Sequence, residues 1–196
     1  KELQASLRKY CLDHIEPYME QDDETSKFRM EIFKGLGELG VGGMTTPEEY
    51  GGAGLNYEDF CIVLEEVARY SVSYAVTLSV STMVQGIFTQ FGNEKQKKEY
   101  LPKLASGEEI GAFALSESSS GSDAASLKTT AKKTDGGYIL NGSKLWITSG
   151  GIAKTYIVMA RTAGVGAKGI SAFIVRDGME GFEYGKKEKK MGWKIS

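Results

Sequence analysis

Residues 113–123 form the segment with the densest set of side chains that could do chemistry. The segment reads FALSESSSGSD, so a short apolar strand runs into hydroxyl-bearing and small residues and then an acid. Hydroxyls and exposed backbone amides can hydrogen-bond a flat heteroaromatic ring or a pyrophosphate without adding charge. A serine-rich surface loop has the same composition, so this segment alone leaves a ligand site and a plain loop both open.

A second candidate segment, residues 144–148, reads KLWIT and is predicted to be a strand. Because side chains alternate along a strand, Trp146 and Thr148 would share one face. A large ring and a hydroxyl on one face can pack against a flavin and hydrogen-bond it. A tryptophan in a β-domain is also typical of an ordinary core, so this pattern leaves two interpretations as well.

The glycine pattern GVGAKG at residues 164–169 matches the G-x-G-x-x-G spacing of dinucleotide-binding loops. That fingerprint requires a helix that begins at the glycines, so that its N-terminal amides face a pyrophosphate. Here ISAFIV follows, which is a strand pattern. The segment is therefore predicted to be a hairpin loop.

Composition argues against several classes of function. The net charge of -2 gives no field that would favour nucleic acid or an anionic membrane. His14 is the sole histidine, and Cys11 and Cys61 lie far apart, so no His-based triad, metal-ligand spacing or disulfide framework is expected. The two separated cysteines favour a reducing compartment. No run approaches the roughly 18 consecutive apolar residues of a membrane span, and no secretory leader opens the sequence.

The hydrophobic period changes in the middle of the chain. Helical spacing predicts five helices, at residues 3–19, 27–39, 57–70, 74–91 and 93–105, with a loop at 42–54. A period of two then predicts strands at 128–134, 138–140, 144–148, 155–160 and 170–175, with hairpin turns at 135–137 and 141–142. We expect a multi-domain α and β fold: an all-α helical domain at 1–109 and an incomplete, antiparallel, β-barrel-like domain at 110–196.

Taken in order, the two candidate segments resemble motifs of the acyl-CoA dehydrogenase family. The family pattern is approximately aromatic-x-x-T-E-P-x-A-G-S-D, followed by N-G-x-K-x-W-I-T-N-G. This chain has FALSESSSGSD at 113–123 and NGSKLWITSG at 141–150. Further agreement lies in PEEYGG at 47–52, FGNEKQ at 91–96, YLP at 100–102 and EKKMG at 188–192, so the resemblance covers essentially the whole chain.

The resemblance implies a cofactor site for FAD in the β-domain. The residues that it assigns to FAD are Phe113, Leu115, Ser116, Ser122, Trp146, Ile147 and Thr148. Trp146 and Thr148 would flank the isoalloxazine ring, and a hydroxyl near flavin N5 would help to position the atom that receives hydride.

The resemblance also implies a substrate site for an acyl-CoA. Ser122 would contact the CoA part, and Val76, Ser79 and Met83 would contact the acyl chain from one face of a helix. Small side chains at two of these three positions would permit a branched or short acyl group. Ordinary helix packing would explain the same three residues.

Three serines depart from the family pattern. Ser116 replaces the usual Thr and keeps its hydroxyl, whereas Ser118 and Ser120 replace the usual Pro and Ala. A loop without the proline has a freer backbone, which would weaken preorganisation of a flavin site by up to about 1 kcal/mol.

The function implied is that of an FAD-dependent acyl-CoA dehydrogenase, which desaturates a fatty-acyl-CoA between its α and β carbons during β-oxidation. The family's glutamate base lies in a C-terminal helical domain, so we expect no catalytic base here, a structural role for Glu117, and an inactive 196-residue piece that holds FAD poorly. Expected partners are electron-transfer flavoprotein and copies of the same chain in a homotetramer, in a bacterial cytoplasm or a mitochondrial matrix.

Other functions share this scaffold. An acyl-CoA oxidase, a nitroalkane-oxidase-like enzyme or a flavin-monooxygenase relative would carry the same motifs, and a non-catalytic binding module would keep the fold without turnover. The sequence leaves these alternatives open, because the choice of electron acceptor depends on solvent access to the reduced flavin.

Overall fold

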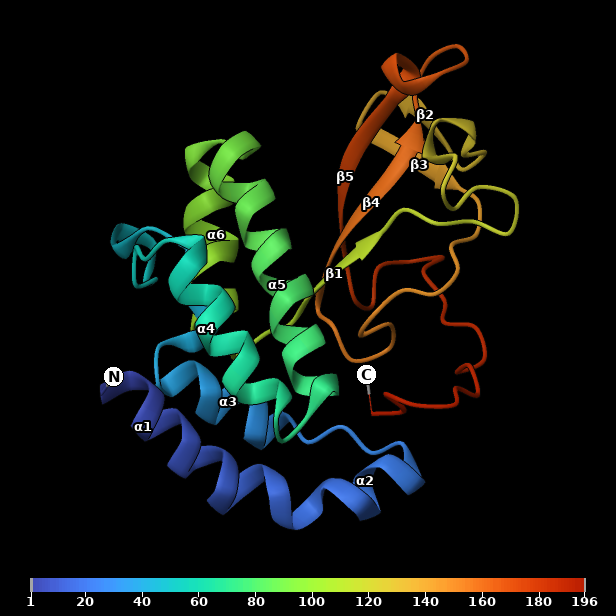
Figure 1. The fold of residues 1–196 in the computed structure, drawn as a ribbon. Coiled ribbons are helices and arrows are strands. Elements are labelled where there is room, and N and C mark those ends of the chain that lie inside the picture. The colour runs from blue at the N-terminus through green and yellow to red at the C-terminus, as the bar shows by residue number, and fades with distance from the viewer. Residues whose placement is uncertain (1, 196) are drawn as a thin grey trace. The chain divides into compact units, whose positions relative to one another are not determined.

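A computed structural model describes residues 2–195, which divide into two compact units (Figure 1). The helical unit comprises residues 2–111 together with 186–195, and the β-unit comprises residues 112–185. The division falls two residues after the expected position, 109. The C-terminal segment also groups with the helices, because Lys187 Nζ donates to the Ser26 carbonyl, Lys194 N donates to Asp23 Oδ1, and Ile195 is buried.

Helix α5 (Val72–Phe91) forms the centre of the helical unit. It packs against α4 (Tyr57–Ala68) and α6 (Glu94–Ala105). Its buried Gln85 side chain is paired: Nε2 donates to the Gly42 carbonyl at 2.8 Å, and Oε1 accepts from the Thr46 hydroxyl at 2.6 Å, whereas in the described part of the chain the buried hydroxyls of Thr82 and Thr89 have no partner. An 18-residue stretch of this 20-residue helix has a mean hydropathy of 1.2 and meets the length and composition of a membrane span, which the sequence did not lead us to expect. More than half of that stretch is buried, as in a core helix.

The N-terminal helix differs from the prediction of one helix at 3–19. The structure has α1 (Glu2–Tyr10), a π-helical turn at Cys11–Ile15, a 3-10 turn at Glu16–Tyr18 and then α2 (Met19–Thr25). Pro17 has no backbone N–H to continue an α-helical ladder, so the backbone changes its hydrogen-bond spacing there and goes on past the expected end. Asp22, inside α2, is buried and accepts two hydrogen bonds from the Arg29 guanidinium, at 2.5 and 2.9 Å.

The other helices agree with the prediction to within a few residues. Helix α3 spans Met30–Glu38, and Gly40 follows it with the left-handed φ of +79° that ends such helices. Asn93 and Gln96 form the expected capping box at the start of α6. The segment predicted as the loop 42–54 contains two short 3-10 turns, at Val41–Gly43 and Glu48–Tyr50.

In the described residues the sheet has five strands, in the order β1-β4-β2-β3, with β5 paired to β4 off this path. They span Gly111–Ala114 (β1), Thr130–Thr134 (β2), Gly137–Asn141 (β3), Thr155–Arg161 (β4) and Ile170–Arg176 (β5). The hairpins β2-β3 and β4-β5 are antiparallel, but β2 pairs with β4 in parallel at Thr130 and Arg161, so the sheet is mixed rather than purely antiparallel.

The glycine pattern at residues 164–169 lies in the loop of the β4-β5 hairpin, as predicted. A single 3-10 turn, Ala167–Gly169, is followed at once by β5, so no helix begins at the glycines. The Arg161 guanidinium donates to the carbonyls of Gly164 and Gly166, at 2.6 and 3.0 Å. The carbonyl groups of the glycine loop are therefore hydrogen-bonded to a side chain of the same hairpin.

Two predictions about residues 141–148 are wrong. Residues 144–148 form no strand, and Asn141 ends β3 without starting a hairpin. Gly142 has a φ of +157°, and a Cβ there would lie 2.3 Å from the Thr129 hydroxyl oxygen. The chain therefore turns sharply away from the sheet, at a position where glycine is required.

Replacing Gly142 by alanine should therefore destabilise the β-unit. We expect Gly142→Ala to lower the free energy of unfolding by about 1–3 kcal/mol, because the new methyl group meets Thr129 and the φ disfavours a Cβ. The check is the midpoint of urea denaturation. Gly136→Ala, in the β2-β3 turn, has nothing within 4 Å of the added carbon and serves as the control. Equal midpoints for the two variants would contradict this account.

Candidate flavin surface and acyl pocket

The serine-rich loop is ordered by its own backbone. The amide of Glu117 donates to the Ser120 carbonyl at 2.8 Å, and the amide of Ser120 donates back at 3.1 Å, which makes a tight turn over Ser118 and Ser119. The Ser120 hydroxyl, buried, donates to the Asp123 carbonyl at 2.8 Å. Backbone hydrogen bonds thus order the loop where the family pattern has a proline.

The second motif lies directly beside the first. The amide of Leu145 donates to the Ser116 carbonyl at 2.9 Å, and Lys144 Nζ donates to the Leu115 carbonyl at 2.9 Å. The structure therefore brings Leu115 and Ser116 next to the segment that carries Trp146. Two other expected flavin residues lie on either side of Leu115 and Ser116 in sequence: Phe113 is half-buried on β1, and Ser122 is exposed beyond the serine turn.

The backbone of residues 146–149 is strained rather than extended. Trp146 has a φ of +57° and Ser149 a φ of +64°, a left-handed conformation that costs a residue with a Cβ about 1–2 kcal/mol. Strand alternation therefore does not apply, and the predicted shared face of Trp146 and Thr148 has no basis in a strand. Such strained positions are found preferentially at functional sites.

The side chains here fit a flat, polar heteroaromatic ring. The Trp146 side chain is 72% exposed, a large area of ring surface open to a ligand. Among residues 2–195, the hydroxyls of Ser116, Ser122 and Thr148 have no hydrogen-bond partner, and neither has the buried hydroxyl of Ser149. An open aromatic ring and free hydroxyls are the groups that pack against and hydrogen-bond a flavin. Within the same residues, no group of three His, Cys, Asp or Glu side chains could hold a metal ion.

Glu117 links the two motifs and is not a candidate base. Its buried carboxylate accepts hydrogen bonds from Lys144 Nζ at 2.7 Å, from the Lys128 amide at 2.6 Å and from the Thr129 amide at 2.9 Å. Burial acts to raise the pKa of Glu117, but the Lys144 ammonium and the two amides outweigh it and lower that pKa to about 2. The carboxylate is ionised and fully occupied, which agrees with the expected structural role.

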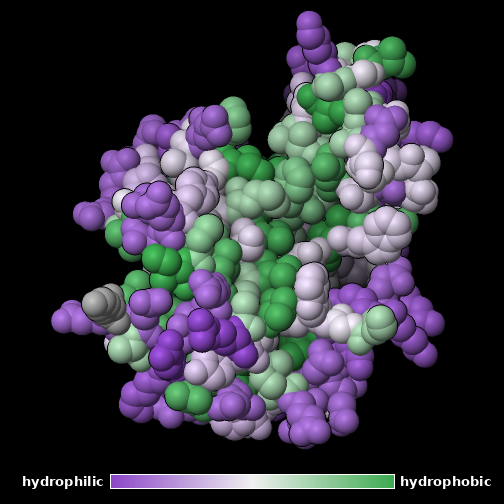
Figure 2. Space-filling model, viewed as in Figure 1, coloured by the Kyte–Doolittle hydropathy of each residue, from purple (hydrophilic) through white to green (hydrophobic). Residues whose placement is uncertain are grey.

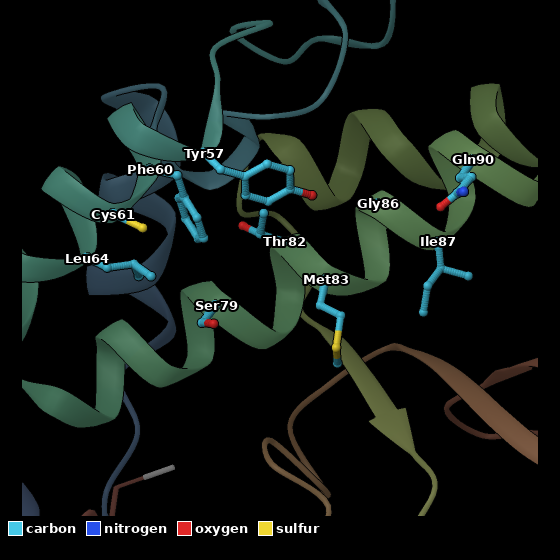
Figure 3. Close-up of a pocket in the computed structure, with 10 residues that line it drawn as sticks. All are labelled: Tyr57, Phe60, Cys61, Leu64, Ser79, Thr82, Met83, Gly86, Ile87 and Gln90. Carbon is cyan, nitrogen blue, oxygen red and sulfur yellow. The ribbon is translucent and has the colours of Figure 1, made fainter.

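A pocket of about 510 Å³ lies between α4 and α5 of the helical unit (Figure 3). Its lining from α4 is Tyr57, Phe60, Cys61 and Leu64, and its lining from α5 is Ser79, Thr82, Met83, Gly86, Ile87 and Gln90. All ten side chains are uncharged, and Figure 3 shows the Tyr57 and Phe60 rings on the side of Thr82. Figure 2 shows hydrophobic side chains gathered over α5 on the face turned to the viewer. The pocket suits an apolar chain.

Two of the three expected acyl-chain residues line this pocket. Ser79 and Met83 do so, whereas Val76, half-buried one turn earlier on α5, does not. Sequence reasoning missed the whole α4 wall and Gly86. The signal was present in the spacing of Tyr57, Cys61 and Leu64, which places them on one face of a helix.

Comparison with known proteins identifies the family. Residues 1–108 match the family profile described as "Acyl-CoA dehydrogenase, N-terminal domain", and residues 112–195 match "Acyl-CoA dehydrogenase, middle domain". The chain therefore belongs to the acyl-CoA dehydrogenase family, and its fold is the one expected: a helical domain followed by a sheet domain.

Two relatives are similar over nearly the whole chain. An acyl-CoA dehydrogenase of Bacillus subtilis (strain 168) is 46% identical over 192 residues, which cover 97% of this chain and 51% of the relative. A mitochondrial isovaleryl-CoA dehydrogenase of Arabidopsis thaliana is 43% identical over 199 residues, covering 100% of this chain and 49% of the relative. The chain thus spans about half the length of the curated relatives that it matches.

Solved structures agree with this assignment. A chain in a structure of the electron transferring flavoprotein of Acidaminococcus fermentans superposes with a TM-score of 0.94 at 38% identity, over 99% of this chain and 52% of that one. An acyl-CoA dehydrogenase of Bacillus anthracis, in complex with FAD, superposes with a TM-score of 0.89 at 37% identity, over 100% of this chain and 33% of that one.

The lowered pKa of Glu117 predicts an acid-dependent loss of stability. A carboxylate whose pKa falls on folding, here from 4.5 to about 2, stabilises the fold fully above pH 4.5 and loses that contribution as the pH falls toward 2. The shift corresponds to roughly 3 kcal/mol.

Urea denaturation at a series of pH values between 3 and 7 would test this. The difference in unfolding free energy between the wild type and Glu117→Gln should be constant near neutrality and shrink below about pH 4.5. A difference that does not change with pH would show that the ionisation of Glu117 does not stabilise the fold.

Proposed function

We propose that this chain is the helical and flavin-binding part of an FAD-dependent acyl-CoA dehydrogenase that forms a double bond between the α and β carbons of a fatty-acyl-CoA. The observation that carries the proposal is the surface at which Leu115 and Ser116, which follow β1, lie beside the segment of Trp146. This surface has the open Trp146 ring and the free hydroxyls described above. The FAD-bound structure of the Bacillus anthracis relative supports the choice of cofactor.

The residues of the β-unit would bind and orient the cofactor. Trp146 would pack on the isoalloxazine ring, and the hydroxyls of Ser116 and Thr148 would hydrogen-bond its polar edge. Bound FAD supplies a hydride acceptor, while the α proton leaves to a base. No residue of this chain is proposed as that base, because Glu117 is ionised and held by three donors.

The pocket of the helical unit would hold the acyl chain. Its uncharged lining makes apolar contacts, and burial of each methylene contributes about 0.8 kcal/mol. Electron-transfer flavoprotein is the proposed electron acceptor, a proposal supported by the structural match to a chain from the Acidaminococcus fermentans structure. We propose further that the complete protein is a homotetramer. Its proposed compartment is a bacterial cytoplasm or a mitochondrial matrix, and the name of the Arabidopsis relative, a mitochondrial isovaleryl-CoA dehydrogenase, supports a mitochondrial one.

The visible absorption spectrum tests the function directly. The complete protein would be titrated anaerobically with short, branched and long acyl-CoAs. Flavin bands that bleach with one thioester are the expected result, and the thioester that acts names the substrate class. A protein without flavin, or flavin that no thioester reduces, would contradict the proposal and favour a binding module or a flavoenzyme acting on another substrate. Rapid reoxidation by oxygen after bleaching would indicate an oxidase.

Gly86 tests the acyl pocket. A Cβ at Gly86 would lie 3.7 Å from the Tyr57 hydroxyl, an ordinary contact, so a larger side chain can be accommodated only by filling the pocket. We expect Gly86→Leu to lower kcat/KM for acyl-CoAs whose chain reaches this position by about 10- to 200-fold, while shorter substrates are unaffected. Gly86→Ala, which adds only the Cβ, is the control. An equal loss for short and long substrates would place the acyl chain elsewhere.

A further inference from the structure

We infer that the buried Glu117–Lys144 pair positions the flavin-binding face by holding Trp146 in its strained, exposed conformation. The inference rests on the proposed function only in taking the ligand to be a flavin. Glu117 and Lys144 are positioning residues in this account, since they act through Trp146 and the Leu115-Ser116 strand end rather than by contact with the ligand.

Three segments of the β-unit meet at this pair. The Glu117 carboxylate accepts from the amides of Lys128 and Thr129, where the chain runs into β2, and from the Lys144 ammonium. The same ammonium donates to the Leu115 carbonyl at 2.9 Å. One charged pair therefore joins the start of the serine loop, the start of β2 and the segment that carries Trp146.

The pair is buried, so its geometry is costly to change. The Glu117 and Lys144 side chains are 7% and 10% exposed. An ion pair away from water is screened little, and removal of one partner leaves a buried charge without a counterion. The Lys144 side chain is consequently held in one position, which also restricts the backbone of the two residues that follow it.

Trp146 needs such a restraint. Its φ of +57° is unfavourable for a residue with a Cβ, and strained conformations of this kind persist only where the surrounding structure determines them. Two contacts hold the residues just before Trp146. The Lys144 ammonium donates to the Glu117 carboxylate, and the Leu145 amide donates to the Ser116 carbonyl. Without the first, the backbone can relax to negative φ, which would redirect the indole ring.

The helical unit contains a second ion pair with a buried carboxylate, which has no part in this face. Arg8 donates two hydrogen bonds to Glu66, at 2.7 and 3.0 Å; the Glu66 side chain is 2% exposed and the Arg8 side chain is 53% exposed. Loss of either pair should lower stability, but only loss of the Glu117–Lys144 pair should alter Trp146. The comparison separates a positioning role from a purely structural one.

The experiment uses the fluorescence of Trp146 in the complete protein. In this chain Trp193 is the only other tryptophan, so Trp193→Phe, together with replacement of any tryptophan elsewhere in the protein, leaves Trp146 as the single reporter. In this background, Glu117→Gln, Lys144→Met and the control Glu66→Gln would be compared as apoprotein, by emission maximum and acrylamide quenching, and then by FAD titration. Lys144→Arg keeps the charge and so remains informative if the first two variants do not fold.

We expect Glu117→Gln and Lys144→Met to change both Trp146 signals and to weaken FAD binding by about 10- to 100-fold, as is usual for residues that orient binding groups. Lys144→Arg should show a smaller change in the same direction, because a planar guanidinium cannot reproduce the two contacts of the ammonium. Glu66→Gln should lower the thermal midpoint without altering Trp146 or FAD affinity.

Two outcomes separate this inference from the proposed function. If Glu117→Gln and Lys144→Arg behave like Glu66→Gln, with unchanged Trp146 signals, the positioning inference is overturned whether or not FAD binds. If the Trp146 signals change as expected but the wild-type protein does not bind FAD, the positioning inference stands and the proposed function fails.

Discussion

The β-unit depends on one buried carboxylate. Glu117 lies at the end of the β1 segment, and its three hydrogen-bond donors come from the start of β2 and from Lys144. A carboxylate removed from water is stable only when each lone pair it presents is satisfied, so these donors must remain together. That requirement places the serine loop beside the tryptophan segment, although residues 124–143 lie between them in sequence. The candidate flavin surface follows from this requirement, because it brings the Ser116 hydroxyl of the first motif next to the segment that carries Trp146 and Thr148.

The helical unit is also held together by buried hydrogen bonds, here around its long helix α5. α5 is long and apolar, and it faces α4 and α6, so its polar residues must find partners inside the core. Gln85 does so by bonding to the Gly42 carbonyl and the Thr46 hydroxyl, which also fixes the glycine-rich segment that follows α3. Another part of α5 is only partly covered by α4, and the uncharged pocket lies between these two helices. The same helix therefore packs in the core through Gln85 and lines a pocket of the kind that binds ligands.

Backbone strain and close backbone contacts occur in the residues that lead from the sheet to the candidate flavin surface. Gly142 approaches Thr129 too closely for any side chain, and Trp146 and Ser149 adopt left-handed conformations. A regular strand at 144–148 would bury or pair the same residues, so its absence keeps the Trp146 ring exposed. The buried hydroxyl of Ser149, without a partner, adds a further unsatisfied group close to that ring in sequence. These unfavourable backbone conformations and the unpaired hydroxyl lie where a bound ligand could offset their cost in free energy.

The sequence by itself determined the class of fold, the family and most of the elements. Helical periodicity, the Asn93 capping box, the Asp135-Gly136 turn and the strand after the glycine loop are local signals, because each depends on residues a few positions apart. It also located both motifs and, of the three residues expected to contact an acyl chain, the two that line the pocket. The tertiary structure alone decided that residues 144–148 are not a strand, that β2 runs parallel to β4, that 186–195 joins the helices, and that α4 forms the wall opposite Ser79. Each of these depends on contacts between residues far apart in sequence. For the KLWIT segment the contacts are those of Lys144 with Glu117 and the Leu115 carbonyl, and of the Leu145 amide with the Ser116 carbonyl, and such contacts override local strand preference.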